Sequence, residues 1–387
     1  MKGDAPPSSA GPAADADLLR RLQAHLRALT EVPAPPFGEG VRSAAVAAAW
    51  RSCGLDVAVD DLGDVVAEVP GGEGPRVMLA AHLDTVFPAG TDVRVRELED
   101  GRWAAPGIAD DGGGLAVLTT LAEEAAAGRG GRRPRLTLAA TVGEEGLGDL
   151  RGARRVVADR AGRIDVFVAV DGGLGQVVSG AVGSRRWVAR FRARGGHAWG
   201  DRGSPSAVHA MGDAVHALIR LDVPSEPASS LNVGLASGGS SVNAIAEVAS
   251  LTLDVRSVDP DTLALLMGRV EQRLRSVGRR HRVELEIEAV GDRPAGRTAD
   301  ERLLGAARAA LARAGVEARV APSSTDANAA VAAGIPAIGF GVARGGDAHR
   351  LSEWIEPGSL LAGYRALGYL LEELSPRADR RERARQP

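Results

Sequence analysis

Short, almost wholly apolar runs of strand length recur along the chain, separated by stretches with helical periodicity. Four of these runs are RVMLAAHLD, RLTLAATVGEE, IDVFVAVDGG and IPAIGFG. They lack the alternation of a half-buried strand, which is typical of strands covered on both faces. A helical pattern at 113–127 separates the first two runs. This succession predicts an α/β fold with a mostly parallel sheet and helices on both faces.

Further elements are predicted at the two ends of this region. An amphipathic helical pattern covers 18–32, and an alanine-rich helix is expected at 40–53. The segment 56–70 alternates like a half-buried hairpin. Two more helices, at 301–314 and 358–374, complete the predicted fold.

The middle of the chain has a different pattern, with alternating strands and two helices at 204–221 and 260–277. Its order is strand, helix, strand, strand, helix, strand, which is typical of a ferredoxin-like α+β unit. We therefore expect a second domain at 180–294, inserted into a discontinuous first domain at 16–179 and 295–374. The polar ends, 1–15 and 375–387, have the composition of disordered tails.

Composition and charge exclude several classes of function. The 387 residues are 44% hydrophobic but only 3% aromatic, and the net charge is -3, so nucleic acid is not an expected partner. Cys53 is the only cysteine, which rules out an internal disulfide and a thiolate metal site and fits a cytoplasmic location. No signal sequence or membrane span is recognisable, so we expect a soluble protein without a membrane partner. Lys2 is the sole lysine, which argues against lysine-based covalent catalysis.

Acids and histidines follow the buried runs. The carboxyl ends of parallel strands form the ligand crevice of an open sheet, so residues distant in sequence are expected to converge there. The residues are His82 and Asp84 (AHLDT), Glu144 and Glu145 (GEEG), Asp171 (VDGG), His349 (GGDAHR), and Asp110 and Asp111 (GIADDGGG).

Bound cations explain how so many acids share one rim. Crowded carboxylates repel one another, and a divalent metal ion cancels that repulsion. Two imidazoles with three or four carboxylates and no thiolate suit zinc, cobalt or manganese. Because these ligands exceed what one tetrahedral ion with an open position needs, we expect two ions sharing a bridging carboxylate.

The paired residues at two strand ends suggest separate roles. Asp84 points the same way as His82 along the strand and could orient its imidazole. Glu144 and Glu145 point to different sides, so one can bind metal while the other acts on a metal-activated water as general base.

Structural explanations remain open for the same residues. His82 could cap a strand, the two glutamates could be solvated turn acids, and Asp171 could be a turn cap. Asp111 is the alternative bridging residue. GIADDGGGLAVL could also be a phosphate loop, but it lacks G-x-G-x-x-G and its acids would repel phosphate.

Taken together, the motifs HLDT, GIADDGGG, GEEG, the DG after a strand, and the late His before a Glu resemble the M20 family of metallopeptidases. The similarity spans roughly Leu18 to Leu374. It implies a di-zinc exopeptidase-like catalytic domain at 16–179 and 295–374. The domain at 180–294 would then be a lid and dimerisation domain.

The resemblance also implies metal ligands. His82 and Asp171 would bind one zinc ion, Glu145 and His349 the other, and Asp110 would bridge the two.

Further roles implied by the resemblance concern catalysis and substrate. Glu144 would be the general base and Asp84 the helper behind the ligand histidine. In GGHAWGDRGSP, His197 would reach the substrate's carbonyl oxygen, often from the neighbouring subunit of a dimer. Asn243 and Arg256 would hold the substrate's terminal carboxylate or backbone. All three could instead be ordinary surface, strand or turn residues.

Two features bear on specificity. Many relatives have a lysine after the two aspartates, where this chain has Gly112, so any contact from that lysine is missing. The segment SSTDANAA, with Asp326, looks most like the peptidase T branch.

These observations predict a di-metal hydrolase that cleaves amide bonds of small peptides as an exopeptidase. The alternative is an N-acyl-amino-acid deacylase with the same mechanism. An inactive metal-binding scaffold is less favoured, because Glu144 and every proposed ligand are present. The segment SSLNVGLAS could be an edge strand, which would allow a homodimer through the lid domains.

Overall fold

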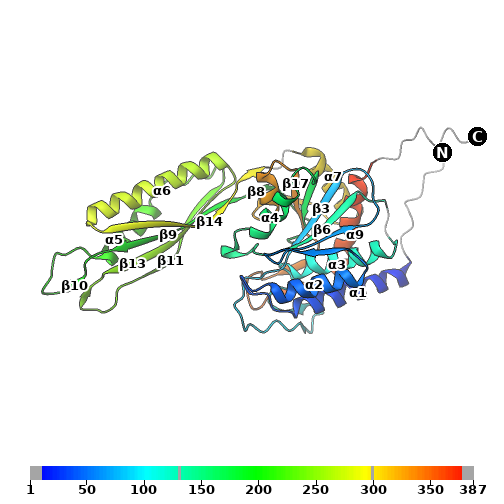
Figure 1. Cartoon of the computed structure of the whole chain (residues 1–387), viewed down its shortest axis with the longest axis horizontal. Coiled ribbons are helices and arrows are strands. Elements are labelled where there is room, and N and C mark those ends of the chain that lie inside the picture. The colour runs from blue at the N-terminus through cyan, green and yellow to red at the C-terminus, as the bar shows by residue number, and fades with distance from the viewer. Residues whose placement is uncertain (1–10, 130–131, 298–299, 377–387) are drawn as a thin grey trace, which may run out of the picture. The chain divides into compact units, whose positions relative to one another are not determined.

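The computed structural model describes residues 11–129, 132–297 and 300–376 (Figure 1). The chain divides into two compact units. Unit 1 comprises Met1–Ser179, Thr298–Ala321 and Thr325–Pro387, and unit 2 comprises Gly180–Arg297 and Pro322–Ser324.

The expected tails differ from the structure at their inner ends. Helix α1 already begins at Pro12, so the last four residues of the expected N-terminal tail, 12–15, are helical. Ser375 is buried and donates a hydrogen bond from its Oγ to the Leu371 carbonyl. Of the other tail residues, 11 and 376 are described, and 1–10 and 377–387 lie outside the described residues.

A nine-stranded sheet forms the centre of unit 1. Eight of its strands lie in the order β1 (Val57–Val59), β2 (Val65–Val69), β6 (Arg135–Thr141), β3 (Arg76–His82), β7 (Val166–Ala169), β17 (Ala337–Phe340), β8 (Gln176–Ala181) and β15 (Gly296–Arg297), and β16 (Arg319–Ser323) pairs with β8.

Strand direction changes across this sheet. The four central strands, β6, β3, β7 and β17, are parallel to their neighbours within that set. The flanking pairs are antiparallel, because β1 and β2 form a hairpin and β8 runs against β17. The predicted α/β class is confirmed. The sheet is mixed, with its parallel part confined to the centre.

Alternate residues of the central strands face two different layers of helices. Val77, Leu79 and Ala81 of β3 pack in a cluster with α1 (Pro12–Thr30), α2 (Gly40–Ser52), α3 (Gly112–Ala126), α7 (Glu301–Arg313) and α9 (Ser359–Leu374). Met78 and Ala80 pack on the other side with α4 (Arg151–Asp159) and α8 (Ala327–Ala332). Burying each large aliphatic side chain contributes about 1.5–3 kcal/mol. The predicted cover of helices on both faces is therefore present.

A second, four-stranded sheet in unit 1 carries loops of the candidate site. Its order is β18 (Arg344–Gly346), β19 (Trp354–Glu356), β5 (Trp103–Ala104) and β4 (Arg96–Glu97). The GIADDGGG loop follows β5, and the loop with His349 joins β18 to β19. Because β19 pairs with β5, the two loops begin from neighbouring strands.

Unit 2 contains a four-stranded antiparallel sheet in the order β11 (Ser229–Gly238), β13 (Val248–Ser257), β9 (Gly183–Arg192) and β14 (Glu284–Arg293). Helices α5 (Ala207–Ile219) and α6 (Pro260–His281) pack on one face of it (Figure 1). The element order is that expected of a ferredoxin-like unit. A separate two-stranded antiparallel sheet pairs β10 (Gly196–His197) with β12 (Ala244–Ile245). Within the described residues, no helix combines the length and apolar character needed to cross a bilayer.

Candidate metal centre

Three neighbouring strands deliver the first chemical groups of the site. β3 ends in His82, β6 ends just before GEEG, and β7 ends two residues before Asp171. These strands are adjacent and parallel in the order β6, β3, β7. Their carboxyl ends therefore lie at one edge of the sheet, where the ligand crevice of such a fold is found.

A set of potential metal ligands gathers at this edge. His82, Asp110 and Glu145 each offer one ligand atom, and these atoms lie within 4.8 Å of one another. His82 is 2% exposed and Glu145 is 6% exposed. The donor set combines an imidazole with two carboxylates and contains no thiolate, which suits zinc, cobalt or manganese.

Asp110 lies between two imidazoles. Its Oδ1 is 2.8 Å from Nε2 of His82, and its Oδ2 is 3.1 Å from Nε2 of His349. The same nitrogen of His349 is 2.8 Å from Oε1 of Glu145. Each oxygen of Asp110 thus faces a different histidine, which is the arrangement that a bridging carboxylate requires.

The electrostatics of these groups favour a cation at this point. Hydrogen bonds to Asp110 and Glu145 raise the pKa of His349 to about 10. Burial opposes the charge of His82, but the hydrogen bond to Asp110 and neighbouring carboxylates raise its pKa well above the usual value. The neighbouring carboxylates therefore stabilise a positive charge placed between them. The residues present fit a divalent metal ion.

Asp171 is close to this cluster but not within the group of three. Burial and then the Asp110 carboxylate raise the pKa of Asp171 to about 7, and His82 opposes that shift. Its ligand atoms do not fall within the 4.8 Å set formed by His82, Asp110 and Glu145. The structure thus brings all five predicted ligands to one region, and their assignment to individual ions stays a prediction.

Asp84 has a different contact from the one expected. Its Oδ1 accepts a hydrogen bond from the backbone N–H of Glu144 at 2.9 Å, and its Oδ2 accepts from that of Glu145 at 2.8 Å. The Asp84 carboxylate is 3.8 Å from Nδ1 of His82, whereas the Asp84 carbonyl is 3.0 Å from that nitrogen. The side chain therefore fixes the turn that presents the two glutamates. The backbone carbonyl faces the imidazole in its place.

Glycines shape that turn. Gly143 has φ +69° and Gly146 has φ +53°, a region that favours glycine. A Cβ at Gly143 would lie 2.0 Å from Nη1 of Arg151. The glycines flanking the two glutamates are thus needed for the chain to turn directly at the end of β6.

Asp111 is used as a helix cap. Its Oδ1 accepts from the backbone N–H of Gly114 at 3.0 Å, at the start of α3, and its Oδ2 accepts from that of His82 at 3.1 Å. Both oxygens therefore have backbone partners. This arrangement supports Asp110 over Asp111 as the bridging candidate. The peptide bond between these two aspartates is cis.

Glu353 is the glutamate that follows His349 in the last motif of the sequence analysis, where it was given no role. It is fully buried and accepts hydrogen bonds from the backbone N–H groups of Gly107, Ala109 and Asp110 at 3.0, 2.8 and 3.0 Å. Burial raises its pKa to about 7 in spite of these bonds. Glu353 therefore holds the loop that carries the bridging candidate.

Arg42 is a second residue that sequence reasoning missed. It is fully buried and donates hydrogen bonds to the carbonyls of Val32, Leu83 and Thr30 at 2.8, 2.8 and 3.3 Å. Burial lowers its pKa to about 10, against the opposing influence of Asp84, Asp111 and Glu353. The available signal was an arginine on the buried side of the alanine-rich helix at 40–53. Its guanidinium supplies positive charge behind the acids.

The predicted substrate residues all lie in unit 2. His197 pairs with Ala244 in the two-stranded β10–β12 sheet, and the Ala198 amide donates to the carbonyl of Asn243 at 2.9 Å, so His197 and Asn243 are neighbours. Arg256 lies near the far end of β13, about 26 Å along the strand from Val248, and forms an ion pair with Asp254 at 2.9 Å. In unit 2, His197 and Asn243 thus lie close together, whereas Arg256 lies apart from them. Their roles stay predictions.

Comparisons with known proteins complete the description of the site. The family model for peptidase family M20/M25/M40 matches residues 78–373, about three quarters of the chain. A Thermococcus kodakarensis protein, named as a candidate LysW-lysine/LysW-ornithine hydrolase, is 37% identical over 93 residues. That segment covers 24% of this chain and 26% of the relative, so the match spans about a quarter of that protein.

Solved structures share the fold at low sequence identity. A tripeptidase from Staphylococcus aureus has a TM-score of 0.78 at 21% identity, and the match covers 92% of this chain and 98% of that one. The Bacillus subtilis YXEP protein, described as a dinuclear metal-binding peptidase of the M20 family, has a TM-score of 0.66 at 17% identity, with 92% and 99% covered.

Proposed function

Since the chain belongs to peptidase family M20/M25/M40, we propose that it is a di-metal exopeptidase that cleaves amide bonds of small peptides. Membership of this family makes the protein a metal-dependent amide hydrolase. The observation that carries the finer proposal is the position of Asp110, which lies with one oxygen toward His82 and the other toward His349. Glu145 completes the group from the GEEG turn.

The proposed ligands are those that the sequence predicted. His82 and Asp171 would hold one ion, Glu145 and His349 would hold the other, and Asp110 would be shared between them. We propose zinc, with cobalt and manganese as metals that the same ligands suit. When bound, the ions supply Lewis-acid polarisation of the amide carbonyl and a lowered water pKa.

The protein's own proton chemistry is assigned to Glu144. Its carboxylate takes a proton from the attacking water and passes it to the nitrogen of the leaving amine. Asp84 supports this role because it fixes the backbone N–H groups of both glutamates at 2.8–2.9 Å. Glu353 contributes indirectly, because it accepts a hydrogen bond from the Asp110 N–H and so holds the loop that carries Asp110.

The proposed substrates are a class of compounds, small peptides. The fold shared with a tripeptidase is consistent with small peptides. N-acyl-amino-acid deacylation is the alternative, and the local match to a protein named for hydrolysis of lysine and ornithine conjugates favours keeping it. His197, Asn243 and Arg256 are proposed to bind the substrate's carbonyl oxygen, backbone or terminal carboxylate. A cytoplasmic location and a homodimer through unit 2 belong to the same proposal.

Replacement of Glu144 tests the assigned base. Glu144→Gln is expected to keep both metal ions and to lower kcat by at least about a hundredfold, because general base catalysis typically contributes 10²–10⁴-fold. Metal content per chain is measured by elemental analysis beside the rate. Glu317→Gln, at an exposed position outside the site, is the matched control. A Glu144→Gln variant with near-normal turnover would refute the base assignment.

Metal removal and substrate screening test the rest of the proposal. Chelation is expected to abolish hydrolysis, and zinc or manganese addition to restore it. Tripeptides, dipeptides and N-acyl amino acids are then compared by kcat/KM on the reloaded enzyme. A preference for N-acyl amino acids would select the alternative, whereas hydrolysis that is insensitive to chelation would contradict both.

A further inference from the structure

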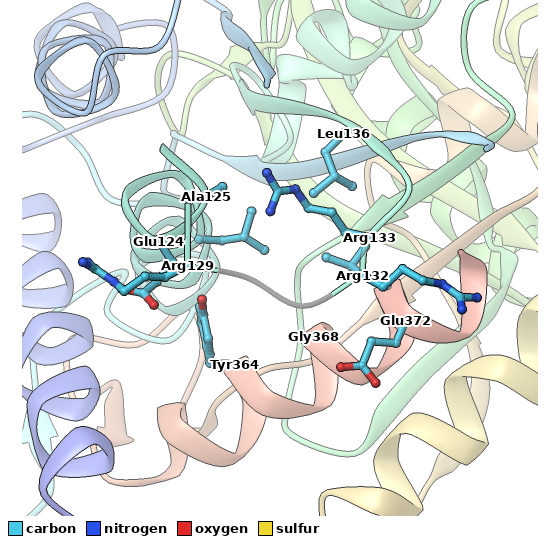
Figure 2. Close-up of a pocket in the computed structure, with 11 residues that line it drawn as sticks. Glu124, Ala125, Arg129, Arg132, Arg133, Leu136, Tyr364, Gly368 and Glu372 are labelled. Carbon is cyan, nitrogen blue, oxygen red and sulfur yellow. The ribbon is translucent and has the colours of Figure 1, made fainter. Parts of the chain in front are cut away.

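We propose that a pocket between the ends of α3 and α9 binds a small carboxylate with an apolar body. The pocket has a volume of about 210 Å³ and lies in unit 1 (Figure 2). It is lined at the C-terminal end of α3, whereas Asp111 caps the N-terminal end beside the candidate metal centre. The helix of 15 residues separates the two sites by about 22 Å. This inference is independent of the proposed function.

Four residues of the lining are apolar. Leu121 and Ala125 come from α3, Leu136 from β6 and Leu371 from α9. A volume of about 210 Å³ is below the roughly 300 Å³ at which pockets for drug-sized ligands begin. The occupant is therefore a small molecule with an apolar part, such as a side chain or a single ring.

The acids of the lining are already neutralised. Glu124 pairs with Arg21 at 2.6 Å and with Arg129 at 3.0 Å. Glu372 pairs with Arg313 at 2.8 Å. Neither carboxylate is left to compensate the other cations of the pocket.

Two arginines of the lining have no acidic partner within the described part of the chain. Arg132 donates to the Ser375 carbonyl at 3.3 Å, and Arg133 donates from Nη2 to the Pro70 carbonyl at 2.7 Å. Figure 2 shows Arg133 extending over the pocket on the side of α3, whereas Arg132 extends past Glu372. The rim therefore carries uncompensated positive charge. Guanidinium groups bind carboxylates strongly through charge-assisted hydrogen bonds.

Tyr364 supplies a further donor. Burial raises the pKa of its hydroxyl above the usual value, so the phenol stays protonated. Among the described residues the hydroxyl has no hydrogen-bond partner, and Figure 2 shows it directed from α9 toward the end of α3. The Tyr364 hydroxyl is therefore a further donor of the lining, on the side of Glu124 and Arg129, whereas Arg132 and Arg133 carry the uncompensated positive charge that would hold a carboxylate head. The leucine side chains of the lining accommodate an apolar body.

A larger side chain at Gly368 would fill the pocket without disturbing the residues that line it. A Cβ at this position on α9 meets no atom within 4 Å, and Gly368 lines the pocket. Gly305 on α7 also has nothing within 4 Å and is exposed outside the pocket. Gly368→Leu and Gly305→Leu are thus a matched pair of helix-favouring substitutions that differ in occlusion of the site.

The test is calorimetric titration of the full-length, metal-loaded protein with phenylacetate, and with phenylacetamide as the neutral isostere. We expect saturable millimolar or tighter binding of phenylacetate, and binding of the amide at least tenfold weaker. Gly368→Leu is expected to abolish binding, and Arg133→Gln to weaken it at least fivefold. Tyr364→Phe is expected to weaken it about fivefold, the value of one hydrogen bond. Gly305→Leu and Arg308→Gln, the latter at an exposed arginine of α7, should bind as the unaltered protein does.

Three outcomes would overturn the proposal. Unchanged phenylacetate binding by Gly368→Leu and Arg133→Gln would place the ligand elsewhere, with the metal centre as the obvious competitor for a carboxylate. Equal binding of phenylacetate and phenylacetamide would remove the role of charge. Absence of saturable binding at millimolar concentration would remove the site. None of these results depends on hydrolysis of any substrate.

Discussion

Single carboxylates of this protein have separate tasks although they share one rim of the sheet. Asp110 faces two imidazoles, Asp84 accepts two backbone N–H groups, and Asp111 caps α3. Asp84 and Asp111 are therefore stabilised by backbone N–H groups, whereas Asp110 is stabilised by imidazoles. Burial alone would disfavour this concentration of charge, so both the backbone amides and the positive groups are necessary.

Glu353 provides a test of how strongly a supporting residue acts on the metal site. Glu353→Gln places an NH₂ group against backbone N–H donors of the 107–110 loop, so this loop is expected to shift. Metal affinity should fall about 10- to 100-fold, the usual cost of losing a residue that orients ligands. It is measured by competition with a chelator.

Glu356→Gln is the control for this change. Glu356 lies three residues further along, in β19, and pairs with Arg344 near the surface at 3.0 Å. It is expected to keep the metal affinity of the unaltered protein. Equal affinities for both variants, with both folded by circular dichroism, would show that Glu353 does not position the loop.

Asp64 makes stability depend on pH. It is fully buried, its Oδ1 accepts from the Val142 amide at 2.8 Å, and burial raises its pKa to about 8. Between about pH 4 and pH 8 the folded state thus holds a proton that the unfolded state has lost, so this contribution to stability falls as pH rises, by up to about 1.4 kcal/mol per pH unit.

Asp64→Asn removes that titration. The free energy of unfolding of the variant, minus that of the unaltered protein, is expected to increase from pH 5 to pH 8. Urea unfolding at the two pH values measures it, and all other titrating groups are common to both proteins. A flat difference for Asp64→Asn would contradict the raised pKa.

At the scale of elements, the turn between β6 and α4 determines where the two glutamates point. A substitution to alanine at Gly143 or Gly146 imposes a similar strain, because both have positive φ, at roughly 1–2 kcal/mol. Only Gly143 also meets Arg151, which would have to leave its 2.6 Å ion pair with Glu39. The two positions therefore separate backbone strain from steric displacement.

Gly143→Ala is expected to lower kcat at least tenfold, since displacement of this turn moves both glutamates. Gly146→Ala, where a Cβ meets nothing within 4 Å, should lose less than about threefold. Steady-state rates at saturating metal measure the contrast. Equal losses in the two variants would mean that Arg151 moves aside without disturbing the site.

Sequence patterns predicted the positions of most of the longer helices and strands. The helix expected at 40–53 is observed at Gly40–Ser52, and the strand expected in the run RVMLAAHLD is observed at Arg76–His82. Short α4 and α8 were not predicted, because nine and six residues give too little periodicity. The hairpin expected at 56–70 is observed as β1 and β2. The antiparallel strands β8 and β15 on the other flank were not predicted, since strand direction depends on partners that are distant in sequence.

At the scale of the whole molecule, the proposed homodimer can be tested at an edge strand of unit 2. β11 is an edge strand of the sheet in unit 2, and its Leu235 is 69% exposed. Exposed edges pair readily with another copy, and an edge lysine prevents this. For the proposed homodimer, Leu235→Lys is expected to give monomers.

Light scattering at micromolar concentration measures the result. Leu265→Lys on α6, where the leucine is 57% exposed, is the control and should remain dimeric. A fully active monomer of the unaltered protein would dismiss the dimer, together with any role of His197 across a subunit boundary.

The sequence by itself determined the α/β class, the resemblance to M20 metallopeptidases and the acids and histidines at the strand ends. These follow from local hydrophobic periodicity and from short motifs, which are contained in the order of residues. The tertiary structure decided which N–H groups Asp84 and Glu353 accept from, that Arg42 is buried behind the acids, and that Arg133 and Tyr364 share a pocket. Such contacts join residues that are distant in the chain, and a hydrogen bond or an ion pair depends on distances that only folding sets.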